Sequence, residues 1–259
     1  ARVNNGVDDA MHMAFVDRAG VVRRAWLIPH RLHDGRSALK QVFDYRGIAA
    51  VEPPFNPRMV AMPFGRLLAA RPWRSIPRAQ PPAWRHEPQW RPEKVASVLC
   101  RVIDEQDSAC LQRWASDRGI SLTALMLWAQ HRAVMRTLCR SDTGGTWFVP
   151  VDMRPAVSEQ GNCSAGVYVH LPAGCQAGDV HQRLAAALRA GQHWWLWYQA
   201  TWIARLGQRF LDWLYPRLAR PGHYIGSFSA LGHWQVPTSD AFASDESFYI
   251  CGPGSPAYP

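Results

Sequence analysis

The sequence predicts an α/β fold, in the form of an α+β layered sandwich, on three observations. Helix-like and strand-like segments are mixed along the chain without the regular strand–helix–strand rhythm of a parallel sheet. No segment is repeated elsewhere in the chain. The 259 residues are 47% hydrophobic and 19% charged, which provides enough apolar material for one large domain or two modest ones.

Two strands and a helix are expected first. Residues 11–19 and 21–30 have the composition of strands joined by a turn, and the second strand has His30 at its carboxyl end. Residues 34–47 favour a short helix that ends near Gly47. The stretch from Pro53 to Pro92 holds about half of the 20 prolines and has no period. It predicts an extended connector laid over a surface between two lobes, with a disordered tail as the alternative.

The second half alternates between strand and helix patterns. Ser121 is a suitable N-cap for the helix that follows it, because its hydroxyl can accept from the free N–H groups of the first turn. In chain order we expect a strand at 94–104, helices at 108–119 and 122–140, strands at 146–155 and 165–172, a long helical stretch at 178–220, and short strands at 223–228 and 247–252.

The charge and the cysteines exclude some classes of protein. The formal net charge is +9, and nearly all of the positive charge is arginine. Arginine suits bidentate contacts with phosphate or carboxylate, and a GC-rich genome gives the same bias, so both explanations stay open. The arginines are spread along the chain and not in a stripe, so no nucleic-acid partner is expected. The six cysteines form no C-x-x-C pair, which argues against structural zinc, and a cytoplasmic location is expected.

The stretch PHRLHDG, from Pro29 to Gly35, carries the candidate chemistry. His30 ends a strand, so its imidazole can project into a cleft and act as a general base. Asp34 and Gly35 suit a turn in which Gly35 is free to adopt a positive φ and leaves room for a ligand. Two alternatives are a surface turn with two exposed histidines and a metal site built from His30, His33 and Asp34, for which no further ligand is evident.

The pattern His30-x-x-x-Asp34-Gly35 resembles the H-H-x-x-x-D-G motif of the acyltransferase superfamily with the chloramphenicol-acetyltransferase-like fold. That superfamily includes condensation domains of nonribosomal peptide synthetases, wax-ester synthases and alcohol acyltransferases. His30 matches the second, catalytic histidine, and Pro29 replaces the first. Further segments resemble the family in its own order: ISLTALMLWAQHRAVMRTL, FVPVDMRP, GNCSAGVYVHLP, DVHQRLAAALRAG and GSFSALG.

The resemblance covers most of residues 11–252 and implies a two-lobed fold. It implies that residues 1–52 are the remainder of an N-terminal lobe, that 53–93 connect the lobes, and that 94–259 form the C-terminal lobe. The motif comes early and the family's late D-F-G-W-type motif is missing. We therefore expect the first part of the N-terminal lobe and the extreme C-terminus to be absent.

The resemblance also implies a mechanism. An acyl thioester and an alcohol or amine enter a tunnel from opposite mouths, and His30 takes the acceptor's proton as it attacks the thioester carbonyl. Asp34, Gly35 and Arg154 have structural roles at this site, with Asp34 pairing with Arg154 across the lobes. The candidates for oxyanion or substrate contacts are Ser227, Ser229 and Asn162. Simpler alternatives are a surface role for Arg154 and a turn role for Asn162, and no chemistry is assigned to His33.

The expected function is therefore acyl transfer from acyl-CoA or an acyl-carrier protein to a small-molecule or lipid acceptor. No metal or permanently bound cofactor is expected, because the acyl-CoA or phosphopantetheinyl carrier is a co-substrate. The alternatives are a condensation domain, which would join carrier-bound substrates (from an acyl or peptidyl carrier protein) through an amide, and a non-catalytic interaction module of the same fold.

A tryptophan-rich segment at 189–220 has two interpretations. It suits a core helix packed between the lobes, or a lipid-facing surface that makes peripheral membrane contact through residues 194–213. It does not predict a membrane-spanning helix, because Arg205 interrupts the apolar run before the roughly 20 residues that a span requires.

Overall fold

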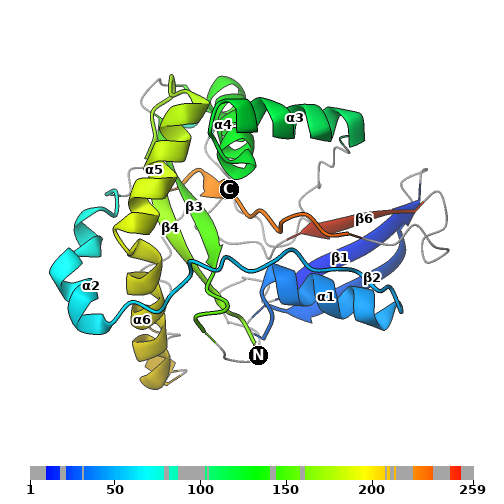
Figure 1. Ribbon diagram of the computed structural model, residues 1–259, viewed down its shortest axis with the longest axis horizontal. Coiled ribbons are helices and arrows are strands. Elements are labelled where there is room, and N and C mark those ends of the chain that lie inside the picture. Colours follow the sequence, from blue (N-terminus) through cyan, green and yellow to red (C-terminus); the bar gives the residue numbers. More distant parts are fainter. Residues whose placement is uncertain are drawn as a thin grey trace.

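The computed structural model describes residues 10–17, 22–30, 32–78, 82–86, 103, 105–140, 144–157, 161–207, 209–210, 213, 224–235 and 246–251. These residues form two three-stranded sheets with helices packed around them, so the predicted mixture of α and β structure is confirmed (Figure 1). The strand expected at 94–104 lies outside the described residues, except for Ile103.

The first sheet has the order β2-β1-β6 and is antiparallel throughout. Strands β1 (Ala10–Asp17) and β2 (Val22–Pro29) form the expected hairpin. Strand β6 (Glu246–Cys251) pairs with the other edge of β1, and Figure 1 shows the red β6 beside the blue β1. The family resemblance implies that 246–251 belong to the C-terminal lobe. The structure differs there, because this late segment returns to complete the first sheet.

Helix α1 (Gly35–Tyr45) packs against the first sheet. It begins at Asp34, whose carboxylate caps the free N–H groups of Arg36 and Ser37. The buried residues of the helix lie on one face and are Ala38, Leu39, Val42 and Phe43. They pack with Met11, Met13 and Ile28 of the sheet in one core. The helix ends just before Gly47, whose φ of +67° suits glycine, as predicted.

The second sheet has the order β4-β3-β5. Strands β3 (Gly145–Asp152) and β4 (Ser164–Leu171) pair along their whole length, from Gly145 opposite Leu171 to Asp152 opposite Ser164. Strand β5 (Gly226–Ser227) is short and runs parallel to β3. The helices of this half are α3 (Glu105–Asp117), α4 (Leu122–Thr137), α5 (Ala177–Arg189) and α6 (Gln192–Arg205). Figure 1 shows α5 and α6 following one another along the β3–β4 hairpin.

A buried histidine ties this half together. His131 of α4 is fully buried, and its Nδ1 accepts a hydrogen bond from Trp147 Nε1 at 3.0 Å. Its Nε2 therefore carries the proton and donates to the carbonyl of Pro172, also at 3.0 Å. Burial lowers the pKa of His131, so the ring stays neutral and serves as a link between α4, β3 and the end of β4.

The proline-rich connector is not wholly extended, which corrects the sequence prediction. It contains helix α2 (Phe64–Ala70) and the short 3-10 helix η1 (Pro72–Arg74). Leu67 of α2 is fully buried and packs with Met153 and Trp194, so this part of the connector contributes to a core. Prolines limited the sequence analysis here, because they interrupt the hydrophobic period that identifies a helix.

The expected long helix at 178–220 is divided at Gly191, which has a φ of +78°. The result is the pair α5 and α6, whose bounds leave only two residues between them. Trp194 is 3% exposed and belongs to a core cluster, as the core-helix interpretation predicts. Trp202 and Trp213 are 43% and 53% exposed. Among the helices of the described residues, none combines the length and apolarity needed to cross a bilayer.

Candidate functional site

The candidate site is built around the turn that follows β2. The N–H groups of Leu32 and His33 both donate to the carbonyl of Pro29, which folds the turn back on the strand end. His30 Nδ1 lies 3.0 Å from the carbonyl oxygen of His33. A carbonyl can only accept, so Nδ1 carries the proton in this contact, and the neutral ring presents an unprotonated Nε2. Among the described residues, no side chain or main-chain group is hydrogen-bonded to this Nε2.

The main chain of His30 is held from the second sheet. Asn162, just before β4, donates from Nδ2 to the carbonyl of His30 at 3.0 Å. Its Oδ1 accepts from the N–H of Ser164 at 3.0 Å, which fixes the amide. Asn162 was expected either as a substrate contact or as a turn residue. In the structure it joins the His30 turn to a segment more than 130 residues away in the chain.

Asp34 has the expected partner on the second sheet. Its side chain is almost fully buried, and Oδ2 accepts from Arg154 Nη2 at 2.8 Å and from the N–H of Cys163 at 3.1 Å. Oδ1 accepts from the N–H groups of Arg36 and Ser37 at 3.1 and 2.9 Å. The ion pair between Asp34 and Arg154 that the resemblance implied is therefore present.

The pKa of Asp34 is lowered, although burial by itself raises it. The hydrogen bond from Ser37, the positive charge of Arg154 and the hydrogen bond from Cys163 outweigh the loss of solvation. Asp34 therefore stays negatively charged and holds the start of α1 against Arg154 and Cys163. It is not poised to exchange protons with a substrate.

Arg154 is not an ordinary surface residue. Its Nε donates to Asp152 Oδ1 at 2.8 Å, so one guanidinium contacts Asp152 on its own segment and Asp34 on the other sheet. Burial lowers the pKa of Arg154, but the hydrogen bond that it donates to Asp152 and the charge of Asp34 outweigh this and raise the pKa overall. Because Nε is bound to Asp152 and Nη2 to Asp34, the orientation of the planar guanidinium is fixed.

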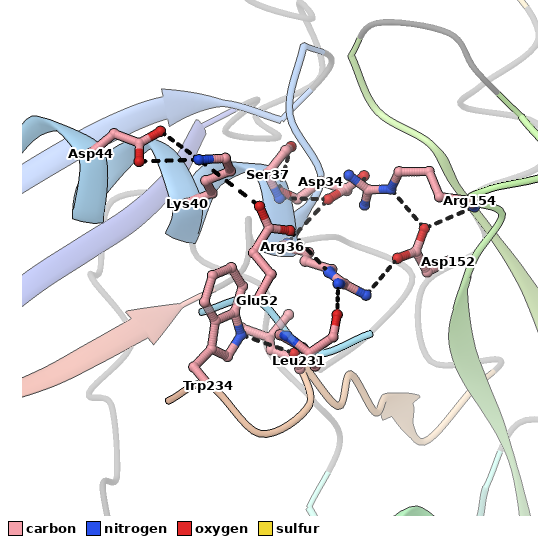
Figure 2. Close-up of polar contacts among 11 residues, drawn as sticks. Asp34, Arg36, Ser37, Lys40, Asp44, Glu52, Asp152, Arg154, Leu231 and Trp234 are labelled. Carbon is pink, nitrogen blue, oxygen red and sulfur yellow. Dashed lines mark hydrogen bonds and ion pairs between the residues drawn. The ribbon is translucent and has the colours of Figure 1, made fainter. Parts of the chain in front are cut away.

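Arg36, Asp152 and Glu52 extend this pair into a chain of alternating charges, which Figure 2 shows. Arg36 Nη1 donates to Asp152 Oδ2 at 3.2 Å, its Nη2 donates to the carbonyl of Pro53, and its Nε lies 3.5 Å from Glu52 Oε2. These three residues were not predicted from the sequence. Asp152 lies two residues before Arg154, and Arg36 directly follows Gly35. A position in the sequence does not show which residue a side chain will pair with.

Gly35 is placed differently from its prediction. It is the first residue of α1 and is not among the glycines with positive φ, so that expectation is wrong. A Cβ at Gly35 would lie 2.8 Å from Leu231 Cδ2. The absence of a side chain therefore admits Leu231, which packs with Trp234 against the core of the first sheet. No ligand space is involved in this contact.

Ser227 and Ser229 lie on the segment that leads to Leu231. Ser227 pairs with Phe148 in the parallel β5–β3 bridge, and both serines are exposed. Because β5 runs parallel to β3, the segment proceeds from the middle of β3 toward Gly35. Neither hydroxyl contacts His30 in the part of the chain that the structure describes. The fold brings their segment to the turn but does not bring these side chains to the imidazole.

The metal alternative has no geometric support. The described residues contain no group of three or more histidine, cysteine, aspartate or glutamate side chains arranged to hold a metal ion. Asp34 is directed at Arg154, and His33 contributes to the turn through its main-chain N–H and carbonyl.

Comparison of the chain with models of protein families, with curated proteins and with solved structures found no match.

Proposed function

We propose that this chain is the His30-bearing part of a thioester-dependent acyltransferase with a two-lobed, chloramphenicol-acetyltransferase-like fold. The observation that supports it most is the ion pair between the buried Asp34 and Arg154, beside a histidine whose Nδ1 contacts a carbonyl and whose Nε2 makes no hydrogen bond among the described residues. A fixed carboxylate that clamps a turn, together with an imidazole held by the carbonyl of His33, is the arrangement that a positioned general base requires. The donor is an acyl-CoA or an acyl-carrier thioester, and the acceptor is an alcohol or amine.

The proposed reaction has balanced steps. The acceptor's oxygen or nitrogen attacks the thioester carbonyl carbon while Nε2 of His30 takes its proton. The tetrahedral intermediate collapses, the carbon–sulfur bond breaks, and the thiolate takes the proton back from the imidazolium. A well-placed base of this kind contributes about 10²–10⁴-fold to the rate.

Release of free thiol from a panel of acyl-CoA and acyl-carrier thioesters, in the presence of alcohol and amine acceptors, tests the proposal. We expect His30→Ala to lower the rate by about 10²–10⁴-fold. His233→Ala is the matched control, because His233 is exposed and has no hydrogen bond among the described residues. The proposal fails if the wild type releases no thiol from any donor, or if His30→Ala and His233→Ala retain equal activity.

A further inference from the structure

A hollow of about 660 Å³ lies at the carboxyl end of α4, facing the turn between β4 and α5. Its wall includes four arginines from two parts of the chain: Arg85, Arg132, Arg136 and Arg140. The hollow is remote from the His30 turn. Leu171, next to the hollow, pairs with Gly145 at one end of the β3–β4 ladder, whereas Asp152 beside Arg154 is at the other. Seven steps of a strand correspond to about 24 Å.

Among the described residues, no carboxylate compensates the positive charge of this hollow. None of the four arginines takes part in an ion pair with a carboxylate of the described residues. The neighbouring acidic group is Asp179, whose carboxylate caps α5 by accepting from the N–H of Gln176 at 2.8 Å. Burial raises the pKa of the Cys139 and Cys175 thiols in the wall, so neither adds a negative charge. The hollow therefore attracts anions.

Two of the guanidinium groups are held in place before any ligand binds. Arg85 donates from Nε to the carbonyl of Cys139 and from Nη2 to the carbonyl of Arg136, both at 2.9 Å. Arg140 donates from Nε to the carbonyl of Arg85 at 3.0 Å. Each group keeps further N–H donors, because a guanidinium has five. Fixed forks of this kind lose little conformational freedom when they bind an oxyanion.

The other two arginines stand four residues apart on α4. Arg132 lies over the Trp128 ring, with 5.0 Å between its Cζ and the ring centroid. Arg136 is exposed in the last turn of the helix. Like charges at this spacing face each other and repel, which disfavours the helix unless an anion lies between them. Both side chains line the hollow from one helix.

We propose that this hollow binds a small ligand that carries two or more adjacent phosphate groups. Four arginines from two segments match several oxyanions better than one, since each fork can contact a separate phosphate. The volume falls within the range of small-molecule sites. Both a bare pyrophosphate and the diphosphate of a nucleotide have this chemistry.

Isothermal titration calorimetry of the full chain with pyrophosphate, ADP and inorganic phosphate tests the site at low ionic strength. We expect pyrophosphate to bind at least about tenfold more tightly than phosphate, because it contacts more guanidinium groups. ADP that binds more tightly than pyrophosphate identifies the source as a nucleotide, and the reverse order identifies a bare polyphosphate. Both orders support the site.

Arg136→Gln is the decisive variant, because its side chain makes no hydrogen bond among the described residues and its loss leaves the Arg85 contacts intact. We expect it to weaken pyrophosphate binding about tenfold, and Arg132→Gln/Arg136→Gln to weaken it further. Arg66→Gln, an exposed arginine on α2, is the control for general charge. The proposal is overturned if the wild type binds neither diphosphate, if Arg136→Gln binds like wild type, or if Arg66→Gln loses as much affinity.

Discussion

At Asp34, one carboxylate serves two parts of the molecule. One oxygen caps α1, and the other accepts from Arg154 and from the N–H of Cys163 beside the second sheet. Its side chain is 3% exposed, so removal of Arg154 leaves a carboxylate that water cannot solvate well, whereas Arg154 keeps its contact with Asp152 when Asp34 is removed. The site is therefore held by a residue that performs no proton transfer.

We expect Arg154→Ala to lower the free energy of unfolding by about 3–5 kcal/mol, because it strands the buried Asp34 carboxylate. We expect Asp34→Ala to lower it by about 2–4 kcal/mol, because it removes the cap of α1 and the acceptor for the N–H of Cys163. The double variant loses less than the sum of the two, with a coupling of at least about 1 kcal/mol. Urea unfolding of the four proteins measures this.

Lys40→Ala is the matched control for that cycle. Its ion pair with Asp44 is exposed on α1, so its removal is expected to change stability by less than about 0.5 kcal/mol. Strict additivity of the Asp34 and Arg154 variants would show that the two side chains do not interact in solution.

Among the elements, the β3–β4 hairpin depends on a glycine at its beginning. Gly144 precedes β3 with a φ of +87°, and a Cβ there would lie 2.1 Å from the carbonyl oxygen of Leu171. A main-chain oxygen in a ladder cannot move aside without breaking its pairing. Gly174, in the turn after β4, has an ordinary φ and no atom within 4 Å of an added Cβ.

We therefore expect Gly144→Ala to destabilise the protein by at least about 2 kcal/mol, from both the left-handed φ and the overlap. Gly174→Ala changes the free energy of unfolding by no more than about 0.5 kcal/mol. Thermal and urea unfolding compare the two variants. Equal effects at both positions would contradict the register of this hairpin.

Local signals predicted some elements well and others poorly. Ser121 does cap α4, with its hydroxyl accepting from the N–H of Ala124 at 3.2 Å, because capping depends on adjacent residues. The break at Gly191 was missed, since the apolar residues continue on both sides of it. Helix α2 was missed among prolines. The pairing of β6 with β1 joins segments more than 200 residues apart, and no local pattern specifies such a partner.

At the scale of the whole molecule, the candidate site is where the two sheets meet. The contacts of Asp34 with Arg154 and of His30 with Asn162 both cross between them. The first was predicted through a family resemblance and not from spacing, because residues 120 positions apart carry no mutual signal. The charges of Arg36, Asp152 and Glu52 were not predicted, since their partners depend on the same long-range packing.

The central claim is that the fold presents Nε2 of His30 as an unprotonated base. The most direct test is the tautomer of that ring, read from long-range ¹⁵N–¹H correlations of histidine-labelled protein at a pH where the ring is neutral and assigned by comparison with His30→Ala. The structure predicts the Nδ1–H tautomer, because Nδ1 donates to the carbonyl of His33. A ring that carries its proton on Nε2 would contradict the account.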